Sequence, residues 1–481
     1  MFIGLDLGTT NIKAVAVSAD GRICARGAAP VELLYLDEGG VEQEIEEIWQ
    51  AALAALCSLG ESVNLSEARA LGVSAQGGAL QRLDEQGRPV GRVISWLDTR
   101  GRTYDDEFTQ TAGADWLIRH TGHGHAATSI GQILRLRRED AESLDPPNAI
   151  GYVGDVIVAR LCGRRAHDAT SLSLAMLFNP SLGGPDPELL DLLQVAPSQL
   201  PELVPADTPA GELRPEVAGE TGLPAGIPVS AALHDQYAAT LGAGAVHAGD
   251  IMFGAGTAWV LLAVADRFPR AVTPGAFVCT HPAPGRYGLL LSLANGGSAF
   301  DWALRIMGLK GRSVGELDAL MAAVPAGSAG LRCYPFLVSG GGLGLQHGQP
   351  AGLVGLSLAH GQGHVLRAVT EGLAFELSRY LRAIEQNGLP LGRLIMCGGA
   401  TASSVTPQIV ADAAGMPVAT LAETGISALG AAMIARALAE PNAELTRIVS
   451  EMTPELCDLR PGPDADIYHK LLDEYLARVS K

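Results

Sequence analysis

Residues 1–17, MFIGLDLGTTNIKAVAV, decide the fold of this chain. An apolar run at each end predicts a short β-strand, and residues 6–11 between them predict a tight turn in which Gly8 permits close backbone approach. The exposed N–H groups of such a turn, its two threonine hydroxyls and the nearby Lys13 would form a cradle for a phosphate group. Asp6 ends the first strand beside this turn, where its carboxylate could hold Mg²⁺ directly or through water. The stretch therefore predicts a phosphate-binding hairpin, with an ordinary hairpin and a polar turn as the alternative.

The turn differs from the two commonest nucleotide-binding loops. Gly4 and Gly8 do not make a G-x-G-x-x-G motif, and no G-x-x-x-x-G-K-[ST] motif occurs in the chain. A strand rather than a helix is expected after the turn, so a helix-dipole site is not predicted. A hairpin that grips phosphate, with an acidic residue where it starts, resembles the first phosphate loop of the superfamily of sugar kinases, heat-shock chaperone ATPases and actin.

Length and composition restrict the class of protein. A chain of 481 residues exceeds the size at which a single core keeps growing, so we expect two domains, residues 1–245 and 246–481. A hydrophobic content of 47% with 18% charged residues is typical of a well-buried globular protein. The net charge of −18 disfavours nucleic acid and anionic membranes as partners. With neither a signal-peptide pattern nor a long uncharged apolar run, we expect a soluble, cytoplasmic protein.

Two polar loops in the first half follow predicted strands. Residues 45–59 have the apolar spacing of a helix, and the strand predicted at residues 71–74 runs into the first loop. A second loop follows the strand that ends near residue 95. Sheets of α/β proteins bind ligands at the ends of their strands, so we expect these loops to share one edge and to line a substrate site. The candidate substrate-binding residues are Gln76, Gly77, Gly78, Trp96, Asp98 and Arg100.

An acidic residue also follows a buried strand near the expected domain boundary. Residues 229–233 (VSAAL) predict a buried strand and run directly into His234 and Asp235. A carboxylate at the edge of a cleft is a suitable general base, whereas a helix N-cap for the residues from Ala238 onward is the alternative. His123 and His125 lie in a Gly-rich loop, where a pocket-lining role is favoured over metal binding because no acidic partner is visible.

The second half repeats the opening device. Residues 250–254 and 259–263 predict two strands around a tight turn that contains Gly256 and Thr257. The repetition suggests two domains of related topology. Residues 295–298, which include Gly297, end a predicted strand and open a helix predicted at residues 299–307. The strand at residues 394–397 ends in a glycine loop that would let a flat ring lie against the backbone. Two phosphate hairpins, a loop for a base and a carboxylate supply the roles that phosphoryl transfer requires.

The chain as a whole, from about residue 2 to residue 475, resembles the FGGY family of carbohydrate kinases, and its layout is most similar to xylulokinases. The resemblance is carried by residues 6–13 (DLGTTNIK), 41–43 (VEQ), 83–89 (LDEQGRP), 96–100 (WLDTR), 234–236 (HDQ), 256–257 (GT), 296–298 (GGS), 369–375 (VTEGLAF) and 398–400 (GGA). It implies an α/β fold of two actin-like (ribonuclease H-like) domains, each a mixed sheet flanked by helices, with a cleft between them. It also implies ATP and Mg²⁺ as cofactors and a small sugar as the phosphoryl acceptor.

The resemblance assigns roles to individual residues. Asp235 would be the catalytic base, and Asp6 and Asp235 the metal ligands. The sugar would bind to the first domain, the nucleotide mainly to the second. The implied nucleotide-binding residues are Gly8, Thr9, Thr10, Lys13, Gly256, Thr257, Gly297, Gly398, Gly399 and Ala400.

Two departures from the xylulokinase pattern affect the choice of sugar. Xylulokinases carry Gln-Met-His-Gly where this chain has Gln76, Gly77 and Gly78, and Ser-Gly-Glu-Arg-Thr-Pro where it has residues 339–343 (SGGGL). We expect a pocket widened near Gly77, with His123 or His125 as a replacement polar partner. A ketopentose such as xylulose is the predicted acceptor, and another ketose or a polyol is the alternative. A non-catalytic sugar- or nucleotide-responsive regulator on the same fold is the other function considered. The sequence leaves open whether the chain forms a homodimer.

Overall fold

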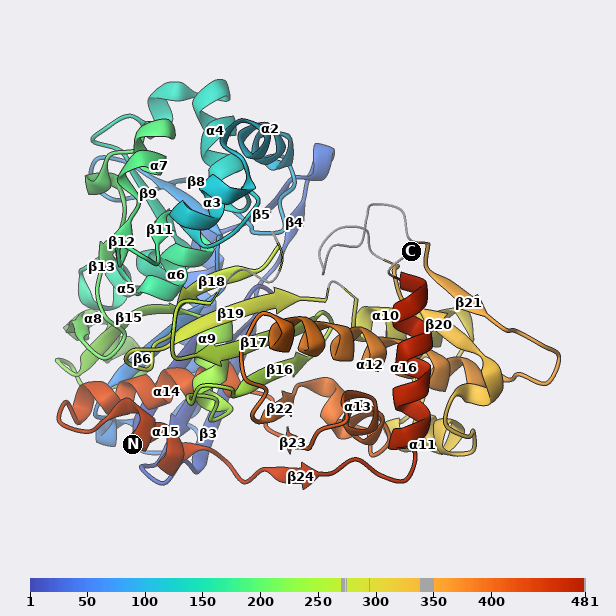
Figure 1. The fold of residues 1–481 in the computed structure, drawn as a ribbon. Coiled ribbons are helices and arrows are strands. Elements are labelled where there is room, and N and C mark those ends of the chain that lie inside the picture. Colours follow the sequence, from blue (N-terminus) through green and yellow to red (C-terminus); the bar gives the residue numbers. More distant parts are fainter. Residues whose placement is uncertain (270–272, 274, 294, 338–349, 480–481) are drawn as a thin grey trace. The chain divides into compact units, whose positions relative to one another are not determined.

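The computed structural model describes residues 1–269, 273, 275–293, 295–337 and 350–479, and Figure 1 shows their fold. The chain forms two compact units. The first unit contains residues 1–246, 266–288 and 425–454, and the second contains residues 247–265, 289–424 and 455–481. The departure noted at residues 339–343 lies outside the described residues. Domains 1–245 and 246–481, one for the sugar and one for the nucleotide, stay a prediction.

The first unit is built on a mixed sheet that starts with the opening hairpin. Its strands lie in the order β13 (Glu202–Leu203), β10 (Ala166–His167), β15 (Pro228–His234), β6 (Leu71–Ala75), β1 (Phe2–Leu7), β2 (Asn11–Val17) and β3 (Ile23–Pro30), with β14 (Pro209–Glu212) paired to β15. β1 runs antiparallel to β2 and parallel to β6, so the predicted hairpin is confirmed, and it lies between β6 and the edge strand β3.

A second sheet in the first unit carries the polar loops. It consists of β4 (Leu34–Tyr35), β5 (Val41–Gln43), β8 (Pro89–Ile94), β7 (Leu80–Leu83) and β9 (Ala149–Tyr152). Three short strands of this unit are β11 (Phe178–Asn179), β12 (Gly184–Pro185) and β18 (Phe277–Thr280). Its helices are α1 (Ile45–Leu59), α2 (Arg102–Ala112), α3 (Ala114–Thr121), α4 (Ser129–Glu139), α5 (Val153–Cys162), α6 (Ala169–Leu174), α7 (Pro187–Leu192), α8 (Pro215–Thr221), α9 (Asp235–Gly242), α14 (Ile426–Ala439) and α15 (Leu445–Met452).

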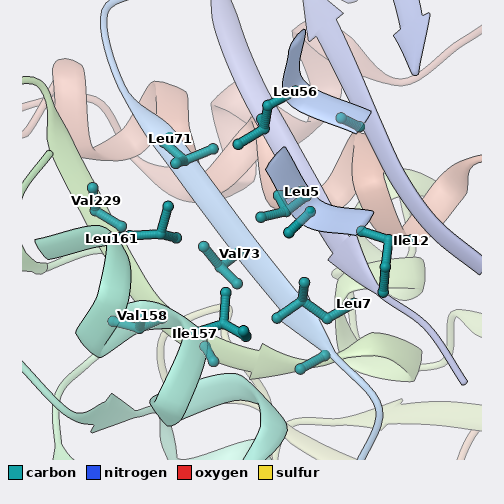
Figure 2. Close-up of a cluster of buried hydrophobic side chains, with 14 of the residues drawn as sticks. Leu5, Leu7, Ile12, Leu56, Leu71, Val73, Ile157, Val158, Leu161 and Val229 are labelled. Atoms are coloured by element: carbon teal, nitrogen blue, oxygen red, sulfur yellow. The ribbon is translucent and has the colours of Figure 1, made fainter. Parts of the chain in front are cut away.

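The core of the first unit lies on both faces of its main sheet, because successive side chains of β1 point to opposite faces. Leu5 and Leu7 point to the face that α1 and α5 cover, as Figure 2 shows. Phe2 belongs to the other cluster, which α9 and α14 fill. A Cβ on Gly4 would lie 1.9 Å from the carbonyl oxygen of Ala428, so α14 packs directly on the backbone of β1. The sheet is therefore covered on both faces, and its strand ends are left for the site.

The second unit repeats this arrangement around its own hairpin. Its strands run in the order β19 (Tyr287–Ser292), β17 (Trp259–Ala265), β16 (Ile251–Ala255), β22 (Leu394–Cys397), β23 (Val418–Leu421) and β24 (Cys457–Leu459), and a separate pair comprises β20 (Arg332–Tyr334) and β21 (Gly352–Val354). β16 is antiparallel to β17 and parallel to β22, as β1 is to β2 and β6. The helices are α10 (Gly297–Ile306), α11 (Val314–Ala322), α12 (Gln362–Gln386), α13 (Thr406–Ala414) and α16 (Ala465–Val479).

Each unit is thus a mixed sheet flanked by helices, which confirms the predicted α/β class. The predicted helix at residues 45–59 has the bounds of α1. None of the helices in the described part of the chain combines the length and apolar character needed to cross a bilayer.

Candidate active site

The phosphate turn lies at the end of the β1–β2 hairpin. Gly8 is required there, because a Cβ at this position would lie 2.6 Å from the carbonyl oxygen of Asn11. Lys13 is the cross-strand partner of Asp6, so the ammonium and the carboxylate flank the same turn. Ser74, at the neighbouring position of β6, donates a 2.8 Å hydrogen bond to Asp6 Oδ1. The turn therefore has a positive and a negative side chain at its base and two threonines at its tip.

A ring of hydrogen bonds joins the phosphate turn to the first polar loop. Thr9 donates through its hydroxyl to Gln76 Oε1 (3.2 Å), and Gln76 donates to Gln43 Oε1 (2.9 Å). Gln43 closes the ring by donating to the carbonyl oxygen of Thr9 (2.9 Å). Trp96 also donates from Nε1 to the Thr9 hydroxyl (3.0 Å), although half of its surface remains exposed. Thr9, Gln76 and Trp96, predicted from separate motifs, are thus brought together.

Asp98 and Arg100 are paired with one another and with the small sheet. Asp98 accepts hydrogen bonds from the Arg100 guanidinium and from the Val41 N–H, and Arg100 also donates to Glu42. Burial alone would raise the pKa of Asp98, but the hydrogen bonds from Arg100 and Val41 outweigh it and lower the pKa. The structure gives this pair a clear role in holding the second polar loop. Their assignment to the sugar stays a prediction.

Asp235 lies in the first turn of α9, directly after β15. His234 is the N-cap residue of this helix, so the alternative in which Asp235 caps the helix does not hold. The Asp235 side chain is about a quarter exposed, and burial raises its pKa to about 6. Burial and the nearby charge of Asp235 raise the pKa of Asp6 to about 7. The two carboxylates therefore interact across the sheet: Asp6 lies on β1, Asp235 directly follows β15, and β6 lies between these strands.

The expectation of a widened pocket at Gly77 is not supported. A Cβ on Gly77 would lie 2.5 Å from Cδ2 and 2.8 Å from Nε2 of His234, so an imidazole already occupies that space. Gly78 has a φ of +71°, which favours glycine, and its missing Cβ would lie 3.1 Å from Thr128 Cβ. The space beside Gly77 and Gly78 is therefore occupied by side chains of other residues in the same unit.

The predicted histidine loop forms local contacts. His123 stacks on Phe277, and its Nδ1 contacts the carbonyl oxygen of His125. His125 Nε2 lies 3.2 Å from a carboxylate oxygen of Asp106. Among the described residues no group of three or more His, Cys, Asp or Glu side chains could hold a metal. Neither histidine is placed by these contacts as the replacement sugar partner.

A pocket of about 790 Å³ in the second unit gathers most of the predicted nucleotide-binding residues of that half. This volume is typical of small-molecule sites. Gly256, Thr257, Gly297, Gly399 and Ala400 all line it. Gly398 does not line it, but immediately precedes Gly399.

Close backbone contacts shape this pocket. Gly297 donates its N–H to the carbonyl oxygen of Gly256 (3.0 Å), and a Cβ on Gly297 would lie 2.5 Å from that oxygen. Gly398 has a φ of +96°, and a Cβ on Gly399 would meet nothing within 4 Å, so the loop presents bare backbone to open space. A flat ring could therefore approach the backbone of Gly399 closely.

Several side chains that support the site were not predicted. Gln43 and Ser74 hold the phosphate turn, and Asp318 accepts hydrogen bonds from Ser403 and Ser404 beside the pocket. Gln43 could have been predicted from the sequence, because it ends the motif of residues 41–43 (VEQ). A single polar residue on an otherwise apolar strand, such as Ser74, carries no comparable signal.

Comparison with known proteins decides the family. The N-terminal domain of the FGGY family of carbohydrate kinases matches residues 1–242, and the C-terminal domain of that family matches residues 253–439. The chain belongs to the FGGY family of carbohydrate kinases. It is therefore a phosphotransferase that uses an alcohol group as acceptor, and the two-domain fold is the fold of this family.

The relatives of this FGGY kinase act on different acceptors. Xylulose kinase of Escherichia coli is 27% identical over 97% of this chain and 96% of the relative. Glycerol kinase of Trichlorobacter lovleyi is 30% identical over 90% of this chain and 89% of the relative. The crystal structure of xylulose kinase from Rhodospirillum rubrum is similar with a TM-score of 0.90 and 26% identity, covering 100% of this chain and 98% of that chain. Similar identity to kinases of a ketose and of a polyol leaves the acceptor undetermined.

Proposed function

We propose that this FGGY kinase transfers the γ-phosphate of ATP to a hydroxyl of a small ketose, most simply a ketopentose such as xylulose. The observation that carries the proposal is the pair of interacting carboxylates Asp6 and Asp235 beside a phosphate turn. Asp235 is the general base. Its pKa of about 6 leaves it ionised near neutral pH and still basic enough to accept a proton.

The residues of the first unit divide the work. The N–H groups of the turn, the hydroxyls of Thr9 and Thr10 and the Lys13 ammonium hold phosphate oxygens. Asp235 accepts the proton of the acceptor hydroxyl as that oxygen attacks the γ-phosphorus. Gln76 and Trp96 orient the sugar, because both are already fixed by hydrogen bonds to the phosphate turn or its neighbours.

The carboxylate pair suits Mg²⁺. This ion binds through one or two carboxylates together with phosphate oxygens and water, and Asp6 and Asp235 supply such ligands. Burial and mutual repulsion disfavour the ionised pair, and a divalent cation would relieve both effects. When bound, Mg²⁺ neutralises charge on the transferred phosphoryl group.

The pocket of the second unit binds the nucleotide. Gly256 and Thr257 face the γ-phosphate, Gly297 contacts the phosphates, and the loop of residues 398–400 faces the adenosine. The bare backbone at Gly399 supports this assignment, since a purine ring can lie flat against it. Because the proposed reaction consumes ATP, we expect the kinase to act in the cytoplasm.

The acceptor is tested with a panel. Ketoses, aldoses and polyols, including xylulose and glycerol, are each incubated with the kinase, ATP and Mg²⁺, and ADP release is measured. We expect the highest kcat/KM with a ketopentose. A higher value for glycerol than for every ketose would replace the ketose by a polyol.

The base is tested by Asp235→Asn. Turnover should fall on the order of 10²–10⁴-fold, the usual contribution of a general base, while ATP binding is retained. Asp105→Asn is a matched control that should keep near-normal turnover, because Asp105 is also buried, also lies in the first turn of a helix of the same unit and also has its pKa raised by burial. Near-normal turnover of a folded Asp235→Asn protein would remove Asp235 from the mechanism.

A further inference from the structure

The imidazole of His234 is fitted between Gly77 and Asp235. His234 is the last residue of β15, and its side chain is only 7% exposed. The Cδ2–Nε2 edge of the ring lies where a Cβ on Gly77 would be, at 2.5 and 2.8 Å. Nε2 lies 3.3 Å from Asp235 Oδ1. One ring edge therefore faces a position without a side chain on one side and the proposed base on the other.

The surroundings of His234 fix the ring in this place. Its backbone N–H donates to the hydroxyl of Thr170 (2.9 Å), which in turn donates to Asp168 (2.7 Å). Tyr237, one turn into α9, packs against the ring with a centroid distance of 6.0 Å. The His234 main chain and ring are thus held by residues from α6 and α9 of the same unit.

The ring nitrogens differ in their surroundings. Nδ1 is buried and has no hydrogen-bond partner in the part of the chain that the structure describes, whereas Nε2 faces the Asp235 carboxylate. A neutral imidazole has one N–H, and Nε2 is the nitrogen at which an acceptor is available. Nε2 is therefore the ring nitrogen that lies beside the Asp235 carboxylate, 3.3 Å from Oδ1.

We propose that His234 is a positioning residue for Asp235, and that Gly77 is needed to make room for its ring. The effects of substitutions at residues 77 and 234 are then coupled, because both positions determine where the His234 ring lies beside Asp235. The inference rests on the proposed role of Asp235 and adds a determinant of specificity to it. A side chain at residue 77, on the loop assigned to the sugar, requires a smaller residue at 234.

This inference changes the design of any variant aimed at the sugar loop. Introducing methionine at residue 77 alone would push the ring of His234 away from Asp235, so turnover would fall for every acceptor alike. Only when His234 is also reduced in size would a larger residue 77 act on acceptor selectivity. A selectivity change should therefore appear in the double variant Gly77→Met/His234→Ala and not in Gly77→Met.

A double-mutant cycle tests the pair. Gly77→Ala, His234→Ala and the double variant are compared with the wild type in kcat, in KM for ATP and in thermal stability. We expect Gly77→Ala to lower kcat on the order of 10- to 100-fold in the wild-type background, as a small misplacement of a catalytic group does, with KM for ATP unchanged. In the His234→Ala background the same substitution should change kcat less than about twofold.

A second comparison separates positioning from packing. His234→Gln keeps an N–H donor near the place of Nε2, whereas His234→Leu keeps only the bulk. Glutamine should restore most of the kcat and leucine should not. His167→Leu is the matched control, because His167 is also buried, ends the neighbouring strand β10 and has an unpartnered Nδ1 among the described residues. It should lower stability without lowering the kcat of the folded protein.

The outcomes are distinguishable from a failure of the proposed function. Gly77→Ala and His234→Ala effects that multiply independently, or equal kcat values for His234→Gln and His234→Leu, would overturn the inference. Near-normal turnover of Asp235→Asn would overturn the proposed base, whatever the cycle gives. An inactive Asp235→Asn with a non-additive cycle supports both.

Discussion

Asp6 is predicted to destabilise the folded kinase, so Asp6→Asn should make the protein more stable while impairing catalysis. Asp6 is 8% exposed, and burial together with the Asp235 charge raises its pKa from 3.8 to about 7. The folded state therefore holds a proton on Asp6 more tightly than the unfolded state does. Asparagine keeps an oxygen that can accept the 2.8 Å hydrogen bond from Ser74 and carries no charge.

The sign and size of the effect follow from linkage. The unfolded state loses this proton near pH 3.8 and the folded state near pH 7, so the free energy of unfolding falls as the pH rises through that interval. The difference between these two pKa values corresponds to at most about 4 kcal/mol. The stability gain of Asp6→Asn should therefore be near zero at about pH 4 and reach its maximum of about 4 kcal/mol at about pH 8.

Urea unfolding of both proteins across this pH range, without metal, measures the difference. Asp84→Asn is a control of opposite sign, because a backbone hydrogen bond from Arg88 lowers the pKa of Asp84. Adding Mg²⁺ should stabilise the wild type and not Asp6→Asn, if Asp6 is a ligand. A variant that is less stable than the wild type at about pH 8, or a gain that does not shrink as the pH falls, would refute the reasoning.

Three further predictions concern the base, the nucleotide pocket and the core. The base that we propose, Asp235, must be ionised to act and has a pKa of about 6, so kcat/KM should fall about tenfold per pH unit below that value; a flat acid limb would exclude Asp235 as the base. Gly399→Leu should raise KM for ATP about tenfold, because the new side chain enters the pocket. The melting temperature should not fall, since a Cβ at this position meets no atom within 4 Å. An unchanged KM would place the nucleotide elsewhere. Gly4→Ala should destabilise by about 1–3 kcal/mol, because its Cβ would lie 1.9 Å from the Ala428 carbonyl oxygen. Its control Gly219→Ala, with nothing within 4 Å in α8, should stabilise by about 0.5–1 kcal/mol, and equal effects of the two would contradict the packing argument.

Local patterns were enough to predict most elements and the repeated hairpin. The apolar spacing of residues 45–59 identified α1, and the paired runs around Asp6–Gly8 identified the opening hairpin. These signals are short-range, because they depend on side chains within one turn or one strand. The predicted nucleotide residues of the second half were also gathered into one pocket, since each follows or precedes a strand of the same sheet.

Contacts between distant parts of the chain could not be predicted from such patterns. α14 packs on β1 although more than 400 residues separate them, and only the small side chains of both elements hint at close approach. The same limit produced the wrong expectation at Gly77. Two adjacent glycines indicate absent side chains, whereas the residue that fills the space, His234, comes from a strand about 150 residues further along the chain.

Asp6, Asp235 and His234, at the strand ends of the first unit's main sheet, are polar groups whose burial is unfavourable. Asp6 and Asp235 are charged groups in a region where burial disfavours charge, and His234 buries an imidazole nitrogen that no described residue satisfies. A sequence selected only for stability would not keep three such groups at the strand ends of one sheet. Their combined destabilisation is tolerated because β1, β6 and β15 are held by covered faces on both sides of the sheet. The covered faces of this sheet therefore hold in place the two carboxylates that we propose as base and metal ligand, although burial disfavours their ionised state.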